Sequence, residues 1–167
     1  MKSFLYLYPI KEYVDYAIMD ESFYMDAGQK KDYLIKCQEI NDLIDKYFRQ
    51  KNYKIIYAHF SNSLMGDEGA SLSEIFNFHE TDNFLDVKIN FSDIKKKVYP
   101  LESELLESLM PVEKLVVAGF HCHDCVSRFH QEALRKGIDS FLEKSLTEQY
   151  FYLIKTGKNL EKTLKKY

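Results

Sequence analysis

The sequence lacks several features that would assign it to particular classes of protein. No apolar run approaches the roughly 20 residues of a membrane-spanning helix, so we expect no contact with a membrane. The net charge is only −3, so the sequence lacks the excess of basic residues that is typical of nucleic-acid-binding proteins. No internal repeat, low-complexity tract or interdomain linker is visible. We therefore expect one globular domain over residues 1–167, with a solvated helical tail at residues 155–167.

Cysteines are few, and an export signal is missing. The chain contains three cysteines. Its short apolar start, residues 4–8, has no small-residue cleavage site after it and resembles a strand more than a signal peptide. Few cysteines without an export signal favour a reducing compartment. The sequence thus predicts a cytoplasmic protein.

Helical periodicity recurs in three segments. One begins near Lys30 and stops near Asn52, a second opens at Pro100 and ends before Pro111, and a third runs from Cys125 to a Gly137 cap. The side chains expected on their buried faces are Tyr33, Leu34, Cys37, Ile40, Leu43, Ile44, Tyr47 and Phe48 in the first, Leu101, Leu105, Leu106, Leu109 and Met110 in the second, and Val126, Phe129, Ala133 and Leu134 in the third.

Apolar and β-branched runs between these helices predict strands. The predicted strands are residues 4–8, 53–60, 114–120 and 138–142, with a further one at either 84–91 or 93–99. Residues 61–83 hold many turn formers and predict an irregular loop or lid. Alternating strands and helices indicate a three-layer α/β/α, doubly wound fold with a mostly parallel sheet of five or six strands.

The segment "GFHCHDC" follows a predicted strand and opens a helix, where doubly wound sheets bind their ligands. Cys125 at a helix N-terminus is a candidate nucleophile, because backbone N–H groups and the helix dipole lower a thiol pKa. The same position also suits a buried, inert cysteine. Cys122 and Cys125 form a CxxC pair, so thiol redox chemistry is a further alternative.

Metal binding by this segment is another alternative. His121, Cys122, His123 and Cys125 are all ligand types, but sequence neighbours cannot all point to one ion. The distant candidates His59, His79 and Cys37 have no recognisable spacing, so we expect no metal and no other cofactor. In the simplest interpretation His121, His123 and Asp124 are polar loop residues, and His130 lies on a helix surface.

The spacing around Cys125 resembles the motif of the isochorismatase-like cysteine hydrolases, which include nicotinamidases. That motif is an apolar strand, Gly-x-x-Thr-x-x-Cys-Val, a helix with small residues and a glycine. Gly119, Cys125, Val126, Ala133 and Gly137 fall on its positions. The segment "ESELLESLM" is similar to the family's helix before this strand, and "KIIYAHF" to its second strand. The resemblance covers most of residues 4–146.

The resemblance implies a parallel sheet, a homodimer or higher homo-oligomer, and a small-molecule substrate. Cys125 would be the nucleophile, and a lysine, Lys95 or else Lys88, would stabilise charge. Backbone N–H groups of His121 and Cys125 would bind the oxyanion. In the family the peptide bond at this point is commonly cis, which implies a cis bond between Phe120 and His121.

The sequence also departs from the family pattern. Pro9 stands where the first strand should carry a proton-transferring Asp, and Cys122 and His121 replace a threonine and a small residue. His59 lies one position early for the Asp-x-His metal pattern. His121 or His123 could act as substitute base beside Cys122 in the pocket. We therefore expect hydrolysis of a small amide or related C–N bond; the alternative is a non-catalytic relative that binds a small molecule or partner.

Overall fold

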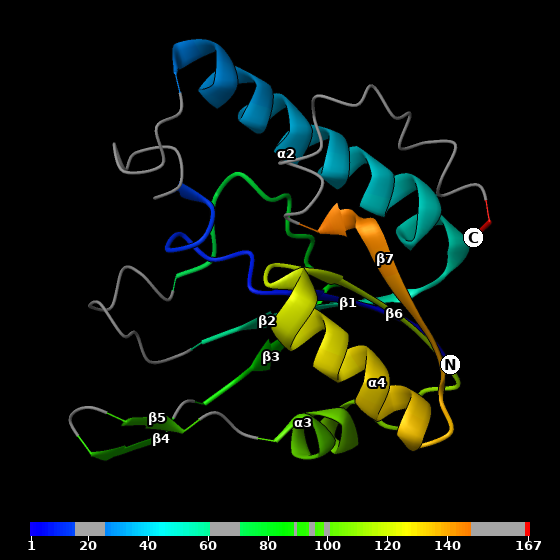
Figure 1. The fold of residues 1–167 in the computed structure, drawn as a ribbon. Helices are drawn as coiled ribbons and strands as arrows, with labels where there is room; N and C mark the ends of the chain where they lie inside the picture. Colours follow the sequence, from blue (N-terminus) through cyan, green and yellow to red (C-terminus); the bar gives the residue numbers. More distant parts are fainter. Residues whose placement is uncertain (16–25, 61–70, 89, 94–95, 99–100, 148–165) are drawn as a thin grey trace.

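The computed structural model describes residues 1–15, 26–60, 71–88, 90–93, 96–98, 101–147 and 166–167 (Figure 1). The strands are β1 (Lys2–Leu7), β2 (Lys54–His59), β3 (Asn83–Asp86), β4 (Asn90–Asp93), β5 (Lys96–Val98), β6 (Lys114–Gly119) and β7 (Asp139–Thr147). The helices are α2 (Ala27–Tyr47), α3 (Glu102–Leu109) and α4 (Ser127–Arg135), with short turns η2 (Arg49–Lys51) and η3 (Cys122–Val126).

Five strands form one parallel sheet in the order β3-β2-β1-β6-β7. Helix α2 covers one face of this sheet, and α3 and α4 lie together on the other (Figure 1). This arrangement confirms the predicted three-layer α/β/α fold. Strands β4 and β5 make a separate antiparallel pair.

Strand β1 lies at the centre of the sheet, and its burial pattern explains its composition. From Ser3 to Leu7 every residue is buried, because both faces of a parallel sheet are covered by helices. On the α2 side, the ring of Phe4 stacks on that of Phe48 with centroids 4.1 Å apart. An aromatic run is therefore favoured here over the alternating pattern of a half-exposed strand.

Helix α2 begins at Ala27, earlier than the predicted Lys30. Asp26 caps it in a capping box with Gln29: the Asp26 carboxylate accepts from the Gln29 N–H at 2.8 Å, and the Gln29 side chain accepts from the Asp26 N–H at 2.9 Å. These two hydrogen bonds start the helix at Ala27, several residues before the first apolar residue of its buried face. Helix α4 ends as predicted, with Gly137 at a φ of +77°.

Several sequence predictions about burial are wrong. Leu34, inside α2, and Leu134, in the last turn of α4, are 41% and 50% exposed, and Leu101 and Met110, which flank α3, are 62% and 51% exposed. Residues just outside a helix no longer follow its periodicity, so an apolar side chain there need not face the core. His130 is not a free surface residue, since its Nδ1 lies 2.9 Å from Ser140 Oγ and burial lowers its pKa.

The two competing strand predictions for residues 84–99 are each partly confirmed. The first segment supplies edge strand β3 and the start of β4, and the second supplies the end of β4 and then β5. Residues 71–82 are irregular, as predicted for the loop, and 61–70 lie outside the described residues. Most of the predicted tail, residues 155–165, also lies outside them. Within the described part of the chain, no helix is long and apolar enough to cross a membrane.

The backbone of β6 lies directly against that of β1 at Gly119. A Cβ atom there would lie 2.3 Å from the carbonyl oxygen of Leu7 and 2.4 Å from its nitrogen. The φ of Gly119 is +118°, which side chains of L-residues rarely allow. Glycine is therefore required both by space and by backbone conformation, at the point where β6 turns into the His-Cys segment.

We expect Gly119→Ala to lower the free energy of unfolding by at least ~2 kcal/mol, because strain and steric overlap add. Gly137→Ala is the matched control: its φ is also positive, but nothing lies within 4 Å of the added Cβ. It should cost only about 1 kcal/mol. Urea denaturation followed by circular dichroism measures both, and equal losses would contradict the steric explanation.

Candidate active site

The order of the sheet strands reverses between β1 and β6. From β1 the chain adds β2 and β3 on one side, then returns to place β6 and β7 on the other. Doubly wound sheets bind ligands in the crevice at the carboxyl ends of such neighbouring strands. Here those ends are Tyr8–Pro9 after β1 and Phe120–His121 after β6. The predicted His-Cys segment therefore lies at the expected place for a site.

Both strands leave the sheet through a residue in the left-handed conformation. Tyr8 has φ 61° and His121 has φ 62°. Such values are uncommon for side chains of this size and cluster at functional positions. The predicted cis bond between Phe120 and His121 is wrong, because the only cis bond within the described residues joins Met110 to Pro111. The left-handed His121 and Gly119 make the chain reversal instead.

Aromatic rings gather over the two strand ends. The Tyr13 ring lies edge-on to the His121 ring, with centroids 4.5 Å apart, and 6.2 Å from the Phe120 ring. Beside them Tyr8 stacks on Phe60 at 4.5 Å. Contact with Tyr13 occupies one side of the His121 ring. The side chain of His121 is therefore exposed on one side and packed against an aromatic neighbour on the other.

Cys125 lies within η3, a single π-helical turn that leads into α4. Its side chain is partly exposed, and it contacts two charged groups. The thiol donates to Asp124 Oδ2 with Sγ at 3.9 Å, and Arg128 Nη2 donates to Sγ, also at 3.9 Å. Cys125 is thus positioned between a carboxylate and a guanidinium.

The predicted lowering of the Cys125 thiol pKa is wrong. This pKa is raised to about 11, chiefly by burial and then by the negative charges of Asp124 and Glu102, against the lowering effect of Arg128. Burial of the sulfur and the carboxylate beside it outweigh the effect expected of a helix N-terminus. Cys125 is therefore a protonated thiol at neutral pH.

The other predicted site residues differ in their exposure to solvent. Pro9 and Cys122 are buried, His123 is exposed, and Lys88 is exposed beyond the end of β3. Lys95 lies outside the described residues. All three cysteines lie in the described ranges, and none of Cys37, Cys122 and Cys125 is in a disulfide. No group of three or more His, Cys, Asp or Glu side chains in the described ranges is placed to hold a metal ion.

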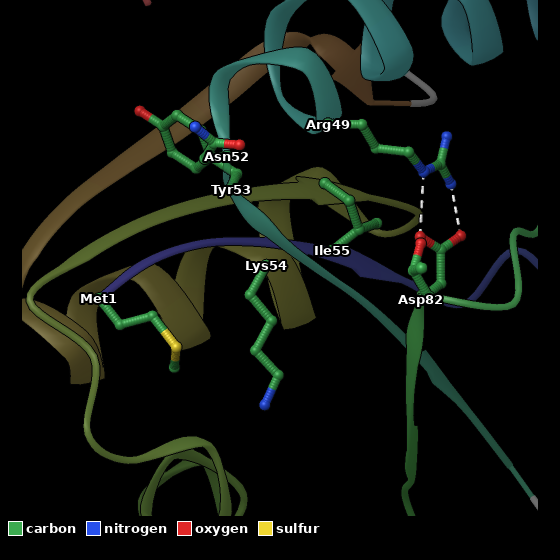
Figure 2. Close-up of a pocket in the computed structure, with 8 residues that line it drawn as sticks. Met1, Arg49, Asn52, Tyr53, Lys54, Ile55 and Asp82 are labelled. Atoms are coloured by element: carbon green, nitrogen blue, oxygen red, sulfur yellow. Dashed lines mark hydrogen bonds and ion pairs between the residues drawn. The ribbon is translucent and has the colours of Figure 1, made fainter.

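An open hollow of about 400 Å³ lies at the opposite edge of the sheet, at the amino ends of its strands. Met1, Arg49, Tyr53, Lys54 and Asp82 are among the residues that line it (Figure 2). Figure 2 shows the Arg49 guanidinium bound to the Asp82 carboxylate by two hydrogen bonds. The same guanidinium also donates hydrogen bonds to the Tyr57 hydroxyl and to the carbonyl of Asn77, so it links η2 to β2 and to the segment before β3.

Comparisons with known proteins identify the fold. The sequence matches no protein-family model and no curated protein. Among solved structures, an isochorismatase-like hydrolase from Alkaliphilus metalliredigens has a TM-score of 0.57 at 12% identity and aligns over 99% of each chain. An isochorismatase family protein has a TM-score of 0.55 at 18% identity over 94% of each chain. The chain has the isochorismatase-like fold.

A third solved structure extends this comparison. An N-carbamoylsarcosine amidase from Thermoplasma acidophilum has a TM-score of 0.51 at 11% identity, over 93% of this chain and 92% of its own. Identities this low establish the architecture and leave the reaction to be argued from the site. The predicted resemblance is therefore confirmed at the level of the fold.

Sequence reasoning missed the charged neighbours of Cys125. Arg128 Nε lies 2.7 Å from Glu102 Oε1 and 3.4 Å from Asp124 Oδ1. Asp124 and Arg128 are four residues apart, a spacing that predicts an ion pair on a helix. That signal was available in the sequence. The contribution of Glu102 was not, because it comes from α3 through the packing of two helices.

We expect the alkylation of Cys125 by iodoacetamide to rise about tenfold per pH unit between pH 7 and 10, because only the thiolate reacts and the pKa is about 11. Arg128→Gln should slow the reaction at pH 9, since it removes the cation that lowers this pKa. Mass spectrometry of the modified peptides separates Cys125 from Cys37, whose burial raises its pKa to about 12. A rate that levels off below about pH 8.5 would contradict the assignment.

Proposed function

We propose that the protein is a cysteine hydrolase that cleaves a small amide or related C–N bond, with Cys125 as nucleophile. The sulfur would attack the carbonyl carbon and form a thioester that water then hydrolyses. Backbone N–H groups of His121 and Cys125 would bind the oxyanion. The observation that carries the proposal is the partly exposed Cys125 thiol at the switch point of the sheet, in contact with both a carboxylate and a guanidinium.

Three further observations support this proposal. The left-handed backbone of Tyr8 and His121 stores strain at the crevice, which is common where chains position reacting groups. The solved structures with this fold include proteins whose names describe hydrolases and an amidase. The aromatic rings at the strand ends form a wall against which the apolar part of a small molecule could pack.

Pro9 favours a second candidate, a non-catalytic protein that keeps the fold and binds a small molecule or partner. Proline has no group that transfers a proton, and Pro9 lies two residues beyond the end of the central strand β1. The resting thiol is also protonated, as expected of a cysteine without an activating partner. The two candidates differ in one measurable property, which is whether Cys125 becomes acylated and turns over.

We expect the full chain to hydrolyse p-nitrophenyl acetate and, more slowly, p-nitroacetanilide, with a transient acetyl group on Cys125. Cys125→Ser should lower both rates at least about 10³-fold, because the hydroxyl is a far weaker nucleophile. Cys37→Ala is the matched control, since Cys37 is a buried cysteine of α2. Absorbance and mass spectrometry follow product and acyl-enzyme. Equal rates in the wild type and Cys125→Ser would exclude the hydrolase and leave the binding protein.

A further inference from the structure

A chain of charged side chains links α3 to the beginning of α4 around Cys125. Glu102, in the first turn of α3, holds the Arg128 guanidinium through Nε at 2.7 Å. The same Nε lies 3.4 Å from Asp124 Oδ1. Arg128 is therefore oriented from two sides. Its Nη2 is left to reach the Cys125 sulfur at 3.9 Å.

Asp124 uses its two carboxylate oxygens differently. Oδ1 faces Arg128, while Oδ2 lies 3.9 Å from Cys125 Sγ and accepts from the thiol. The Asp124 side chain is exposed to solvent at 66%, so water can reach it as well. A carboxylate that contacts both the thiol and the solvent has the contacts that a proton carrier needs in a two-step hydrolysis.

We infer that Asp124 is the general base and acid of the site and that Arg128, held by Glu102, is the cation that stabilises the Cys125 thiolate. These residues would supply the proton transfer that the chain after β1 cannot, because Pro9 at that position has no carboxylate. The inference rests on the proposed hydrolase function. Asp124 and Arg128 are catalytic residues in it, since both touch the reacting sulfur, and Glu102 is a positioning residue.

The acylation step balances with these groups alone. Asp124 Oδ2 takes the proton from Sγ as the sulfur forms a bond to the carbonyl carbon, and the C=O electron pair moves to oxygen. When that pair returns, the C–N bond breaks and the nitrogen takes the proton from Asp124. An amine or ammonia leaves, and a thioester on Cys125 remains.

Deacylation reverses the roles. Asp124 takes a proton from water as the water oxygen attacks the thioester carbon. The C–S bond then breaks, the sulfur leaves as a thiolate beside Arg128, and it regains the proton from Asp124. The sum is one amide and one water converted to one carboxylic acid and one amine, with no other reactant.

The surroundings of the sulfur explain why a base is needed. Burial raises the thiol pKa, the charges of Asp124 and Glu102 raise it further, and Arg128 only partly opposes them. The thiol is thus protonated before substrate binds, and nucleophilic attack requires transfer of its proton. The Asp124 carboxylate thus has two opposite effects: its charge raises the thiol pKa, and it accepts the thiol proton. Because these effects can be measured separately, the inference is testable.

Asp124→Asn should change two rates in opposite directions. Alkylation of Cys125 by iodoacetamide at pH 8 should become several-fold faster, because a negative charge beside the thiol is removed. Turnover of p-nitroacetanilide should become about 10²–10⁴-fold slower, because the proton carrier is lost. A merely structural aspartate would not speed one reaction while slowing the other. Asp42→Asn, on the exposed side of α2, is the matched control and should change neither rate.

The leaving group provides a second readout. Acylation by p-nitrophenyl acetate releases p-nitrophenolate, which needs no proton, whereas p-nitroacetanilide carries the same acetyl group but releases an amine. The acylation rate of Asp124→Asn should therefore fall less than about tenfold with the ester and far more with the anilide. Arg128→Gln should slow acylation by both, and Arg128→Lys should restore part of the rate.

The outcomes separate this inference from the proposed function. If the wild type forms no acetyl-Cys125 and Cys125→Ser hydrolyses both substrates equally well, the hydrolase function and the inference both fail. If acylation of Cys125 occurs but Asp124→Asn retains anilide turnover, only the inference fails. Loss of turnover in His123→Gln with full activity in Asp124→Asn would assign the proton to His123 and likewise overturn it.

Discussion

The close approach of β1 and β6 is the constraint on which the site depends. These strands pair along their whole length, from Lys2 with Lys114 to Leu7 with Gly119. At the last pair the backbones leave no space for a Cβ atom, so the two strand ends lie together and the chain after β6 must turn at once. His121 makes that turn in a left-handed conformation, and Cys125 follows within one helical turn at the same edge.

Two groups of side chains with different chemistry lie beyond the carboxyl ends of β1 and β6. In one group, rings of Tyr8, Tyr13 and Phe60 pack among themselves and against Phe120 and His121. In the other, Asp124 and Arg128 contact the Cys125 sulfur, and Glu102 of α3 binds Arg128. Apolar surface together with a few convergent polar groups is the usual composition of a small-molecule site.

Pro9 leaves the fold intact because the backbone does not depend on a carboxylate at that position. The sheet and the turn after β6 depend on glycine, apolar burial and strand pairing. Asp124, which precedes Cys125 in the sequence, contacts the sulfur by local geometry alone. Burial raises the thiol pKa, and an aspartate so close raises it further because its charge disfavours the thiolate.

The sequence by itself determined the architecture. Apolar runs such as residues 4–8 and 114–120 read as buried strands because both faces are covered, and the periodic stripe after Lys30 read as a helix because one face is. The motif around Cys125 likewise indicated where the site lies. Tertiary structure alone decided the ionisation of that cysteine, the left-handed turn in place of a cis bond, and the contact of Glu102 with Arg128. Those properties depend on burial and on distances between elements far apart in the chain, which periodicity does not encode.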